Sequence, residues 1–502
     1  MTDETDSSQQ ETHTQSIERL STGVCGLDEI LQGGLIPERS YLLRGEPGTG
    51  KTILGLHYLT TGIAQNEIPL FINLEETTED IKQNAASLGF DLTDVHFLDL
   101  SPKSDFFAGD QGYDVFESGE VERDPLVEEI TEQVTDLQPD RVFVDPITQL
   151  RYLSTDEYQF RKQALSFMRM LSEQGATVLF TTQATEDAPD EDLQFMSDGT
   201  IQLGYAATGR SISVPKFRGS PTESGGHSME ITSDGLVVYP ELSPGKYDRS
   251  FVNEAISSGV PELDELLHGG LDRGTVTVLS GPTGVGKTTT GTQFMKEAAG
   301  RGERSVIYLF EESESTFMQR SEAINIPVHE MRERGTLSVE EIESLQVSPQ
   351  EFANMVRHEV EEKDADIIML DGIAGYKLGL QGEEDDLVTH LHALNRYLKN
   401  MGVTVILIDE VANITGEFQA TNVGISYLAD NIIFLRHLEV RGEMKKVIGV
   451  LKMRTSDFER TLRKFEITKH GITVGEPLTN LRGILSGTPQ WTEDQNPDVS
   501  RE

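Results

Sequence analysis

The sequence is poor in cysteine, tryptophan and basic residues for its length. Its 502 residues include one cysteine, Cys25, and one tryptophan, Trp491. A single cysteine excludes an intramolecular disulfide and a cysteine metal cluster, so we expect Cys25 to be a small packed residue. The 42 basic residues are outnumbered by 85 acidic ones, a formal net charge of −43. Because a surface of this sign repels nucleic acid and anionic membranes, neither is expected as a partner.

Long apolar runs are also missing. No run reaches the roughly 20 residues that a membrane-spanning helix needs, and residues 1–15 are polar, without an apolar signal region. These features predict a soluble, cytoplasmic protein. The acidic excess fits either a halophilic microbe, in which it keeps proteins hydrated in high salt, or an ordinary acidic cytosolic protein. We favour the halophilic origin and expect the source to be an archaeon.

Two glycine-rich stretches fit the phosphate-loop pattern G-x-x-x-x-G-K-[ST]. In this pattern backbone N–H groups cradle phosphates, the lysine reaches the outer phosphates, and the final hydroxyl ligates Mg²⁺. The helix that follows points its positive end at the anion. We therefore predict two sites for ATP and Mg²⁺, with Thr52 and Thr288 as metal ligands. The two loops are Gly45, Glu46, Pro47, Gly48, Thr49, Gly50, Lys51 and Thr52, and Gly281, Pro282, Thr283, Gly284, Val285, Gly286, Lys287 and Thr288.

The two loops belong to duplicated segments. Residues 23–52 and 259–288 align without a gap at an offset of 236 residues, and half of the thirty positions are identical. Each segment predicts a short amphipathic helix ended by a glycine pair, followed by a strand that enters the loop. We therefore predict domains over 17–240 and 253–485, joined by a linker over 241–252. The polar segments 1–16 and 486–502, the second with Trp491, are expected to be disordered tails.

A pair of acidic residues follows an equivalent strand in each half. Glu75 and Glu76 come after the apolar strand over 69–74, and Glu311 and Glu312 come after the strand over 306–310. Doubly wound sheets place their chemistry at the carboxyl ends of strands, where a carboxylate can deprotonate a water that attacks a γ-phosphate. The alternative, solvated strand ends in an acidic protein, is disfavoured by the shared register.

Two later pairs of strands end in polar residues as well. Asp145 ends the strand over 141–145 and Asp371 ends the strand over 367–371, a pattern that holds Mg²⁺ directly or through water. The strands over 177–183 and 404–410 end in Thr182, Gln183 and Glu410. These three residues either sense the γ-phosphate or simply end a strand, and the sequence favours neither interpretation.

The order of elements predicts the fold class. Strands alternate with helical segments in both halves, which is typical of an α/β fold. We predict two tandem P-loop NTPase domains, each a mainly parallel twisted sheet with helices on both faces. Sequence rich in β-formers closes each half, over 201–214 and 229–239, and over 431–434 and 447–452. The Gly- and acid-rich segment 105–124 is predicted to be a loop without a readable role.

Two tandem phosphate-loop domains, each with a Glu-Glu pair after its second strand, resemble the KaiC family within the RecA-like ATPases. The resemblance covers about residues 17–489. Its most specific part resembles the "RGEM…KMR" strands of the family's second domain, here Arg441, Gly442, Glu443 and Met444 followed by Lys452, Met453 and Arg454. The resemblance implies RecA-like domains in a homohexameric double ring, with ATP bound between neighbouring subunits.

The resemblance also assigns roles to basic residues that would otherwise pass for surface charges. In the family a Lys-x-Arg reaches across to the γ-phosphate held by the neighbouring subunit. Lys216 with Arg218, and Lys452 with Arg454, match it. A fixed guanidinium supplied in this way stabilises the charge that spreads over a transferring phosphoryl group.

Clock-like members of the family hydrolyse ATP slowly in the first domain and phosphorylate themselves in the second. Counted back from Arg441, the phosphoacceptor pair falls on Ser426 and Tyr427, so the second position is not threonine. A nearby threonine of the family pattern matches Thr421. The departure at Tyr427 argues against assuming a clock-like two-site cycle. Glu311 is the residue we assign as the base for either water or a hydroxyl.

The leading hypothesis is an ATP-hydrolysing hexamer with Ser/Thr autokinase activity in its second domain, a signalling or timing switch with unidentified protein partners. A nucleotide-gated scaffold with negligible turnover is the first alternative, and the intact acid pairs argue against it. A RecA-type DNA-repair ATPase is the second alternative. The sequence has no basic cluster of useful size, which disfavours DNA binding.

Overall fold

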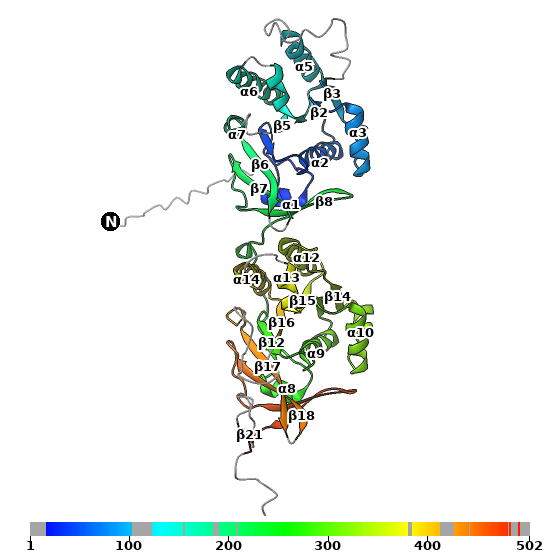
Figure 1. Cartoon of the computed structure of the whole chain (residues 1–502), viewed down its shortest axis with the longest axis vertical. Coiled ribbons are helices and arrows are strands. Elements are labelled where there is room, and N and C mark those ends of the chain that lie inside the picture. The colour runs from blue at the N-terminus through cyan, green and yellow to red at the C-terminus, as the bar shows by residue number, and fades with distance from the viewer. Residues whose placement is uncertain are drawn as a thin grey trace, which may run out of the picture. The chain divides into compact units, whose positions relative to one another are not determined.

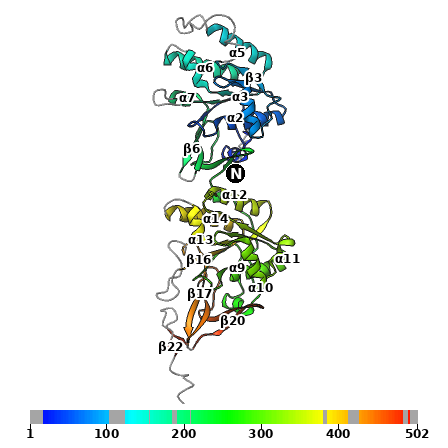
Figure 2. The same cartoon turned by 45° about the vertical axis from the view of Figure 1, so that its right-hand side comes forward.

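The computed structural model describes residues 17–102, 123–153, 156–183, 190–206, 209–379, 384–411, 426–440, 442–479, 481–482 and 490–491. The chain divides into two compact units, Met1–Glu241 and Leu242–Glu502, each with its own sheet and core (Figure 1, Figure 2). This division falls at the start of the predicted linker. Residues 1–16, most of the segment 105–124, Thr421 and Arg441 lie outside the described residues.

The described part of the first unit is built on a sheet with the strand order β3-β2-β4-β5-β1-β6-β7-β8-β9. Strands from β3 through β6 pair in parallel, and the strands from β6 to β9 pair antiparallel. The four central strands, β1, β2, β4 and β5, are buried along nearly their whole length because both of their faces are covered. The strands are β1 (Ser40–Arg44), β2 (Pro69–Asn73), β3 (His96–Asp99), β4 (Arg141–Asp145), β5 (Thr177–Thr181), β6 (Gly199–Ala206), β7 (Gly209–Phe217), β8 (His227–Thr232) and β9 (Gly235–Tyr239).

Helices cover both faces of this sheet. One core contains Leu54 of α2 and Ile81 of α3, and the other contains Val134 of α5 and Phe160 of α6. The cores lie on opposite faces because side chains alternate along each strand. The helices are α1 (Cys25–Ile30), α2 (Lys51–Ala64), α3 (Thr78–Ser87), α5 (Arg123–Leu137), α6 (Glu157–Glu173) and α7 (Glu191–Met196), with a 3₁₀ turn η1 (Ile147–Leu153).

The described part of the second unit repeats this topology. Its sheet has the order β14-β13-β15-β16-β12-β17-β18-β19-β20, which is the order of the first sheet strand for strand. The predicted class of two tandem α/β domains is therefore confirmed. The strands are β12 (Val276–Gly281), β13 (Arg304–Leu309), β14 (Leu337–Glu341), β15 (Ala365–Asp371), β16 (Thr404–Glu410), β17 (Asn431–Val440), β18 (Glu443–Lys452), β19 (Arg463–Thr468) and β20 (Gly471–Pro477).

The second unit also has two cores. Phe294 of α9 and Phe317 of α10 lie in one, and Phe352 of α12 and Leu391 of α14 lie in the other. The helices are α8 (Pro261–Leu266), α9 (Lys287–Gly300), α10 (Glu314–Ala323), α11 (Val328–Glu333), α12 (Pro349–Glu361), α13 (Ile373–Gly379) and α14 (Glu384–Asn400). Shorter elements are η2 (Pro244–Lys246), β10 (Ala255–Ile256), β11 (Leu271–Asp272), β21 (Leu481–Arg482) and β22 (Gln490–Trp491).

The duplication extends to individual hydrogen bonds. In the first unit Asp28 of α1 accepts hydrogen bonds from the hydroxyls of Ser21 (2.6 Å) and Thr22 (2.7 Å). In the second unit Asp264 of α8 accepts the two equivalent hydrogen bonds, from the hydroxyls of Ser257 (2.6 Å) and Ser258 (2.7 Å). Each carboxylate thereby ties the incoming chain to the short helix, as expected for two copies of one ancestral segment.

Three local expectations differ from the structure. Cys25 is exposed rather than packed, because α1 turns Leu27 and Ile30 toward the core and leaves its first residue outside. Tyr247 of the predicted linker packs edge-on against Tyr397 of the second unit, with ring centroids 4.9 Å apart. Trp491, expected in a disordered tail, pairs with Leu481 in a two-stranded antiparallel ladder.

None of the helices in the described ranges combines the length and the apolar character that crossing a membrane requires.

The helix after the first phosphate loop lies unusually close to the sheet at Gly55. A Cβ atom at this position would clash with the buried ring of Phe143 on β4. We predict that Gly55→Ala lowers the free energy of unfolding of the first domain by about 1–3 kcal/mol, because the rigid core cannot accept the extra methyl. Gly300→Ala, with no neighbour within 4 Å, is the matched control and should be neutral or slightly stabilising. Denaturant unfolding measures both, and an equal effect of the two substitutions would contradict the packing argument.

Candidate active sites

The first phosphate loop connects β1 to α2. Gly48 (φ 80°) and Gly50 (φ 104°) adopt the left-handed backbone that residues with a side chain avoid. The ammonium group of Lys51 donates hydrogen bonds to the carbonyl oxygens of Gly45 (2.7 Å) and Glu46 (3.1 Å). The ammonium group therefore lies against the first two residues of its own phosphate loop. Burial lowers the pKa of Lys51, and the carboxylates of Asp145 and Glu75 oppose this shift.

The second phosphate loop connects β12 to α9 with the same geometry. Gly284 (φ 70°) and Gly286 (φ 114°) again adopt the left-handed conformation. Lys287 donates to the carbonyl oxygens of Gly281 (2.8 Å) and Pro282 (3.0 Å). Burial lowers its pKa as well, opposed most by the carboxylate of Glu410. Left-handed glycines at the start of a helix are typical of loops that bind anions through backbone N–H groups, so both loops fit a phosphate.

In the first domain the predicted metal ligands meet. The hydroxyl of Thr52 donates to Asp145 Oδ2 (2.7 Å), and the hydroxyl of Thr181 donates to Asp145 Oδ1. Burial raises the pKa of Asp145, while these two hydrogen bonds oppose the rise. A hydroxyl and a carboxylate beside a phosphate loop are the oxygen ligands that Mg²⁺ prefers, so these residues fit the ion.

The acid pair of the first domain faces the same cavity, whose volume is about 340 Å³. Glu75 Oε2 accepts a hydrogen bond from the side-chain amide of Gln183 (2.7 Å). Glu76 lies within reach of the amide of Asn84 (3.5 Å). Burial, reinforced by the carboxylates of Asp145 and Glu75, raises the pKa of Glu76. Gln183 therefore orients Glu75. The repulsion between the crowded carboxylates acts on Glu76, whose pKa it helps to raise.

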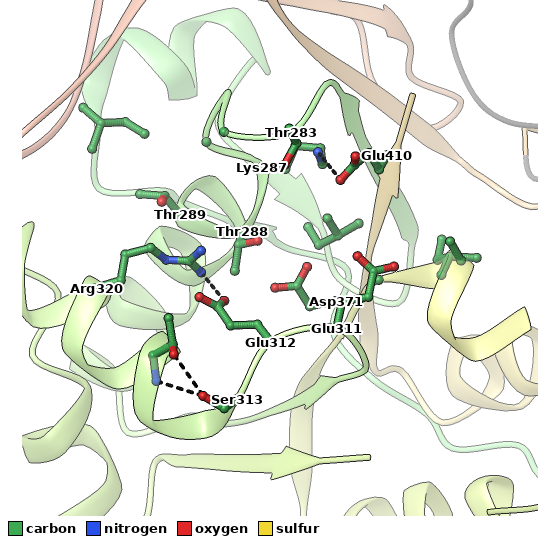
Figure 3. Close-up of a pocket in the computed structure, with 18 of the residues that line it drawn as sticks. Thr283, Lys287, Thr288, Thr289, Glu311, Glu312, Ser313, Arg320, Asp371 and Glu410 are labelled. Carbon is green, nitrogen blue, oxygen red and sulfur yellow. Dashed lines mark hydrogen bonds and ion pairs between the residues drawn. The ribbon is translucent and has the colours of Figure 1, made fainter. Parts of the chain in front are cut away.

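The second cavity is larger, about 630 Å³, and it brings together the corresponding residues (Figure 3). In this view Glu312 and Asp371 lie next to Thr288, and Glu311 lies beyond Asp371. Burial raises the pKa of Asp371 to about 6, and a hydrogen bond from the Thr288 hydroxyl opposes the rise. Glu410 also lines the cavity and lies beside Lys287, with its Oε2 4.0 Å from Lys287 Nζ.

Two of the three candidate γ-phosphate sensors face a cavity, and the third does not. Gln183 and Glu410 line their cavities. Thr182 turns away from the cavity, and its hydroxyl donates to the buried carboxylate of Asp190 (2.7 Å). The sequence placed Thr182 and Gln183 at the same strand end, but successive side chains along a strand point to opposite faces. Only one of the two can therefore face the cavity.

The Lys-x-Arg residues are absent from the described lining of their own cavities. At the end of β7, Lys216 donates to the carbonyl oxygens of Gln194 (2.5 Å) and Ser197 (2.6 Å), near the C-terminus of α7. Arg218 Nη1 lies 3.7 Å from a carboxylate oxygen of Asp198. Exposed helix-terminal carbonyls are favourable partners for such cations.

The second Lys-x-Arg lies beside two of the phosphoacceptor candidates. Lys452 donates to the carbonyl oxygens of Ser426 (3.1 Å) and Ala429 (2.6 Å). Arg454 donates to the carbonyl oxygen of Tyr427 (3.4 Å), whose side chain is 49% exposed. The structure thus joins Lys452, Arg454, Ser426 and Tyr427 into one cluster, outside the described lining of the cavity that contains Glu311.

Sequence reasoning missed several residues of the two sites. Thr181 reaches Asp145 from the neighbouring strand, and only the pairing of β4 with β5 reveals this contact. Lys446 of β18 lines the second cavity and donates to the carbonyl oxygen of Gly284 (2.8 Å). Arg320 of α10 lines the same cavity and forms an ion pair with Glu312 (2.9 Å). Aligning the helices that follow the two acid pairs would have singled out Arg320.

The fold and both sites define a tandem P-loop ATPase. The family model described as KaiC ATPase matches residues 20–243 and again residues 256–479. The chain belongs to the KaiC family. The circadian clock oscillator protein KaiC of Rippkaea orientalis is 29% identical, over 98% of this chain and 95% of the relative. The KaiC proteins of Parasynechococcus marenigrum and Synechococcus elongatus are each 27% identical over 97% of this chain, and over 96% and 95% of their own lengths.

Asp371 should destabilise its domain at neutral pH when no nucleotide is bound. Because folding raises its pKa from 3.8 to about 6, the folded state binds the proton more tightly than the unfolded state. Stability is therefore lost as the pH rises between these two values. We predict that Asp371→Asn stabilises the nucleotide-free second domain by about 1–3 kcal/mol at pH 8 and by almost nothing near pH 3.5.

Denaturant unfolding at the two pH values measures this difference. Asp457→Asn, at an exposed position of the same domain, is the control and should show no gain at pH 8. A loss of stability in Asp371→Asn at pH 8 would contradict the burial argument.

Proposed function

We propose that the protein is an ATP-hydrolysing switch of six copies arranged as a double ring, with Ser/Thr autokinase activity in its second domain. One observation carries the proposal. Each cavity gathers a phosphate loop, an aspartate and an acid pair, while the matching Lys-x-Arg lies elsewhere on the domain. A complete site would then combine the cavity of one copy with the Lys-x-Arg of the next.

Hydrolysis follows from the residues of each cavity. Lys51 and Lys287 bind the outer phosphates together with the backbone N–H groups of their loops. Thr52 with Asp145, and Thr288 with Asp371, would hold Mg²⁺, which would neutralise part of the charge of the phosphates when bound. Glu75, oriented by Gln183, accepts a proton from the attacking water in the first domain.

In the second domain we assign Glu311 as the base for water or for a protein hydroxyl. The Ser426 oxygen attacks the γ-phosphorus, the bond from that phosphorus to the bridging oxygen of ADP breaks, and the hydroxyl proton passes to Glu311. Lys452 of the Lys-x-Arg contacts the segment that contains the acceptor, because its ammonium group donates a hydrogen bond to the Ser426 carbonyl oxygen (3.1 Å). Drawing Lys452 and Arg454 to a neighbour's γ-phosphate would therefore bring Ser426 and Tyr427 with them.

The charge of the chain bears on its setting and its partners. With a formal net charge of −43, the protein is suited to a cytoplasm of high salt and to protein partners rather than nucleic acid. The nucleotide-gated scaffold differs from the proposal in one measurable respect, since it would release negligible phosphate.

The proposal predicts both free phosphate and protein-bound label from γ-labelled ATP with Mg²⁺ in molar potassium chloride. Glu311→Gln should abolish the bound label and leave hydrolysis by the first domain intact. Glu75→Gln is the matched variant and should reduce free phosphate while the label persists. Mass spectrometry should place the label on Ser426, Thr421 or Tyr427.

Two outcomes of this assay would overturn parts of the proposal. Free phosphate without bound label would remove the autokinase and leave an ATPase switch. Neither product, from protein that binds ATP, would favour the scaffold instead.

A further inference from the structure

The two acid pairs face different partners at equivalent positions. Helices α3 and α10 follow the acid pairs at the same offset of 236 residues, so Asn84 in the first domain corresponds to Arg320 in the second. Asn84 Nδ2 lies 3.5 Å from Glu76 Oε2, and Arg320 Nη2 lies 2.9 Å from Glu312 Oε2. The same contact is therefore made by a neutral amide in one site and by a guanidinium in the other.

Arg320 has neighbours on two sides. Its guanidinium carbon lies 6.0 Å from the centre of the ring of Phe317, which is fully buried, and its Nη2 faces the carboxylate of Glu312. Its charge also acts on Asp371, where it lowers the pKa. Figure 3 shows the guanidinium on the side of the cavity where Thr288 and Thr289 lie, pointing toward Glu312. The side chain is 41% exposed, so a ligand in the cavity can reach it.

The charges that line the two cavities differ accordingly. Among the described residues, the first cavity has one cation, Lys51, and three carboxylates. The second has three cations, Lys287, Arg320 and Lys446, and four carboxylates. An isolated acid pair repels a triphosphate, so a guanidinium that neutralises one of its members removes part of this penalty.

We propose that Arg320 is an anion-binding residue that strengthens the binding of a nucleoside triphosphate in the second site, and that Asn84 leaves the first site without this contribution. The inference rests on the proposed function, because it takes the cavity as an ATP site. Arg320 acts electrostatically: it neutralises Glu312 by pairing with it, and its own positive charge attracts the phosphates. Its effect therefore grows with the number of phosphates on the ligand.

Fluorescent adenine nucleotides test this in Lys51→Ala protein, in which the second site alone keeps its phosphate-loop lysine. Adding Arg320→Asn, which grafts the residue of the first site, should weaken ATP binding by about threefold to tenfold. The loss should be smaller for ADP and negligible for AMP. Arg320→Lys keeps the charge and should retain most of the affinity. Raising the concentration of KCl should shrink the difference between the variants.

The reciprocal graft keeps the inference falsifiable if Arg320→Asn impairs folding. In Lys287→Ala protein, Asn84→Arg should tighten ATP binding at the first site by a similar factor. An equal loss for ATP, ADP and AMP in Arg320→Asn would show a contact to the nucleoside and overturn the inference. Unchanged ATP affinity in both grafts would overturn it too. Failure of the proposed function differs from both, because neither parent variant would then bind ATP.

Discussion

A hydrogen bond between a threonine hydroxyl and a partly buried aspartate joins each phosphate loop to the centre of its sheet. In the first domain Thr52 is the first-turn residue of α2, and Asp145 is the last residue of β4. The bond fixes the start of the helix over the carboxyl ends of the parallel strands. The acid pair and the loop lysine lie around this threonine–aspartate junction. Mg²⁺ would also bind there.

Duplication preserved this junction while the surrounding polar residues diverged. Thr181 donates a second hydrogen bond to Asp145, but the strand pairing places Ile408 opposite Asp371. Ile408 has no hydroxyl to donate. The acid pairs likewise face Asn84 in one domain and Arg320 in the other. One backbone scaffold therefore carries two sites with different electrostatics.

Much of the site could be predicted from the sequence, because functional residues of a parallel sheet gather at the carboxyl ends of its strands. Phosphate loops have a local pattern, and apolar strands ending in Glu75, Asp145 and their second-domain counterparts converge because parallel strands end at one edge. Contacts such as Thr181 with Asp145 and Arg320 with Glu312 depend on which strands pair and on which face of a helix looks inward. No local pattern contains that information.

The exposed Cys25 shows the same limit at the level of a single helix. In a six-residue helix the apolar spacing of Leu27 and Ile30 decides the buried face, and a small residue outside that spacing remains in solvent. The positions of Lys216 and Lys452 needed the structure for a different reason. Their sequence motif carries no indication that they lie away from the cavity of their own domain.

We propose that each site is completed by a neighbouring copy. The direct measurement mixes two variants, Lys287→Ala and Arg454→Ala, both in a Glu75→Gln background that silences the first domain, and follows phosphate release after subunit exchange. If the residues act between copies, about a quarter of the second-domain interfaces in a one-to-one mixture combine an intact loop with an intact arginine, and activity returns. The control mixture, Lys287→Ala with the Lys287→Ala/Arg454→Ala double variant, has no intact interface and stays inactive. If the first mixture is as inactive as the control, the sites are not completed by a neighbouring copy.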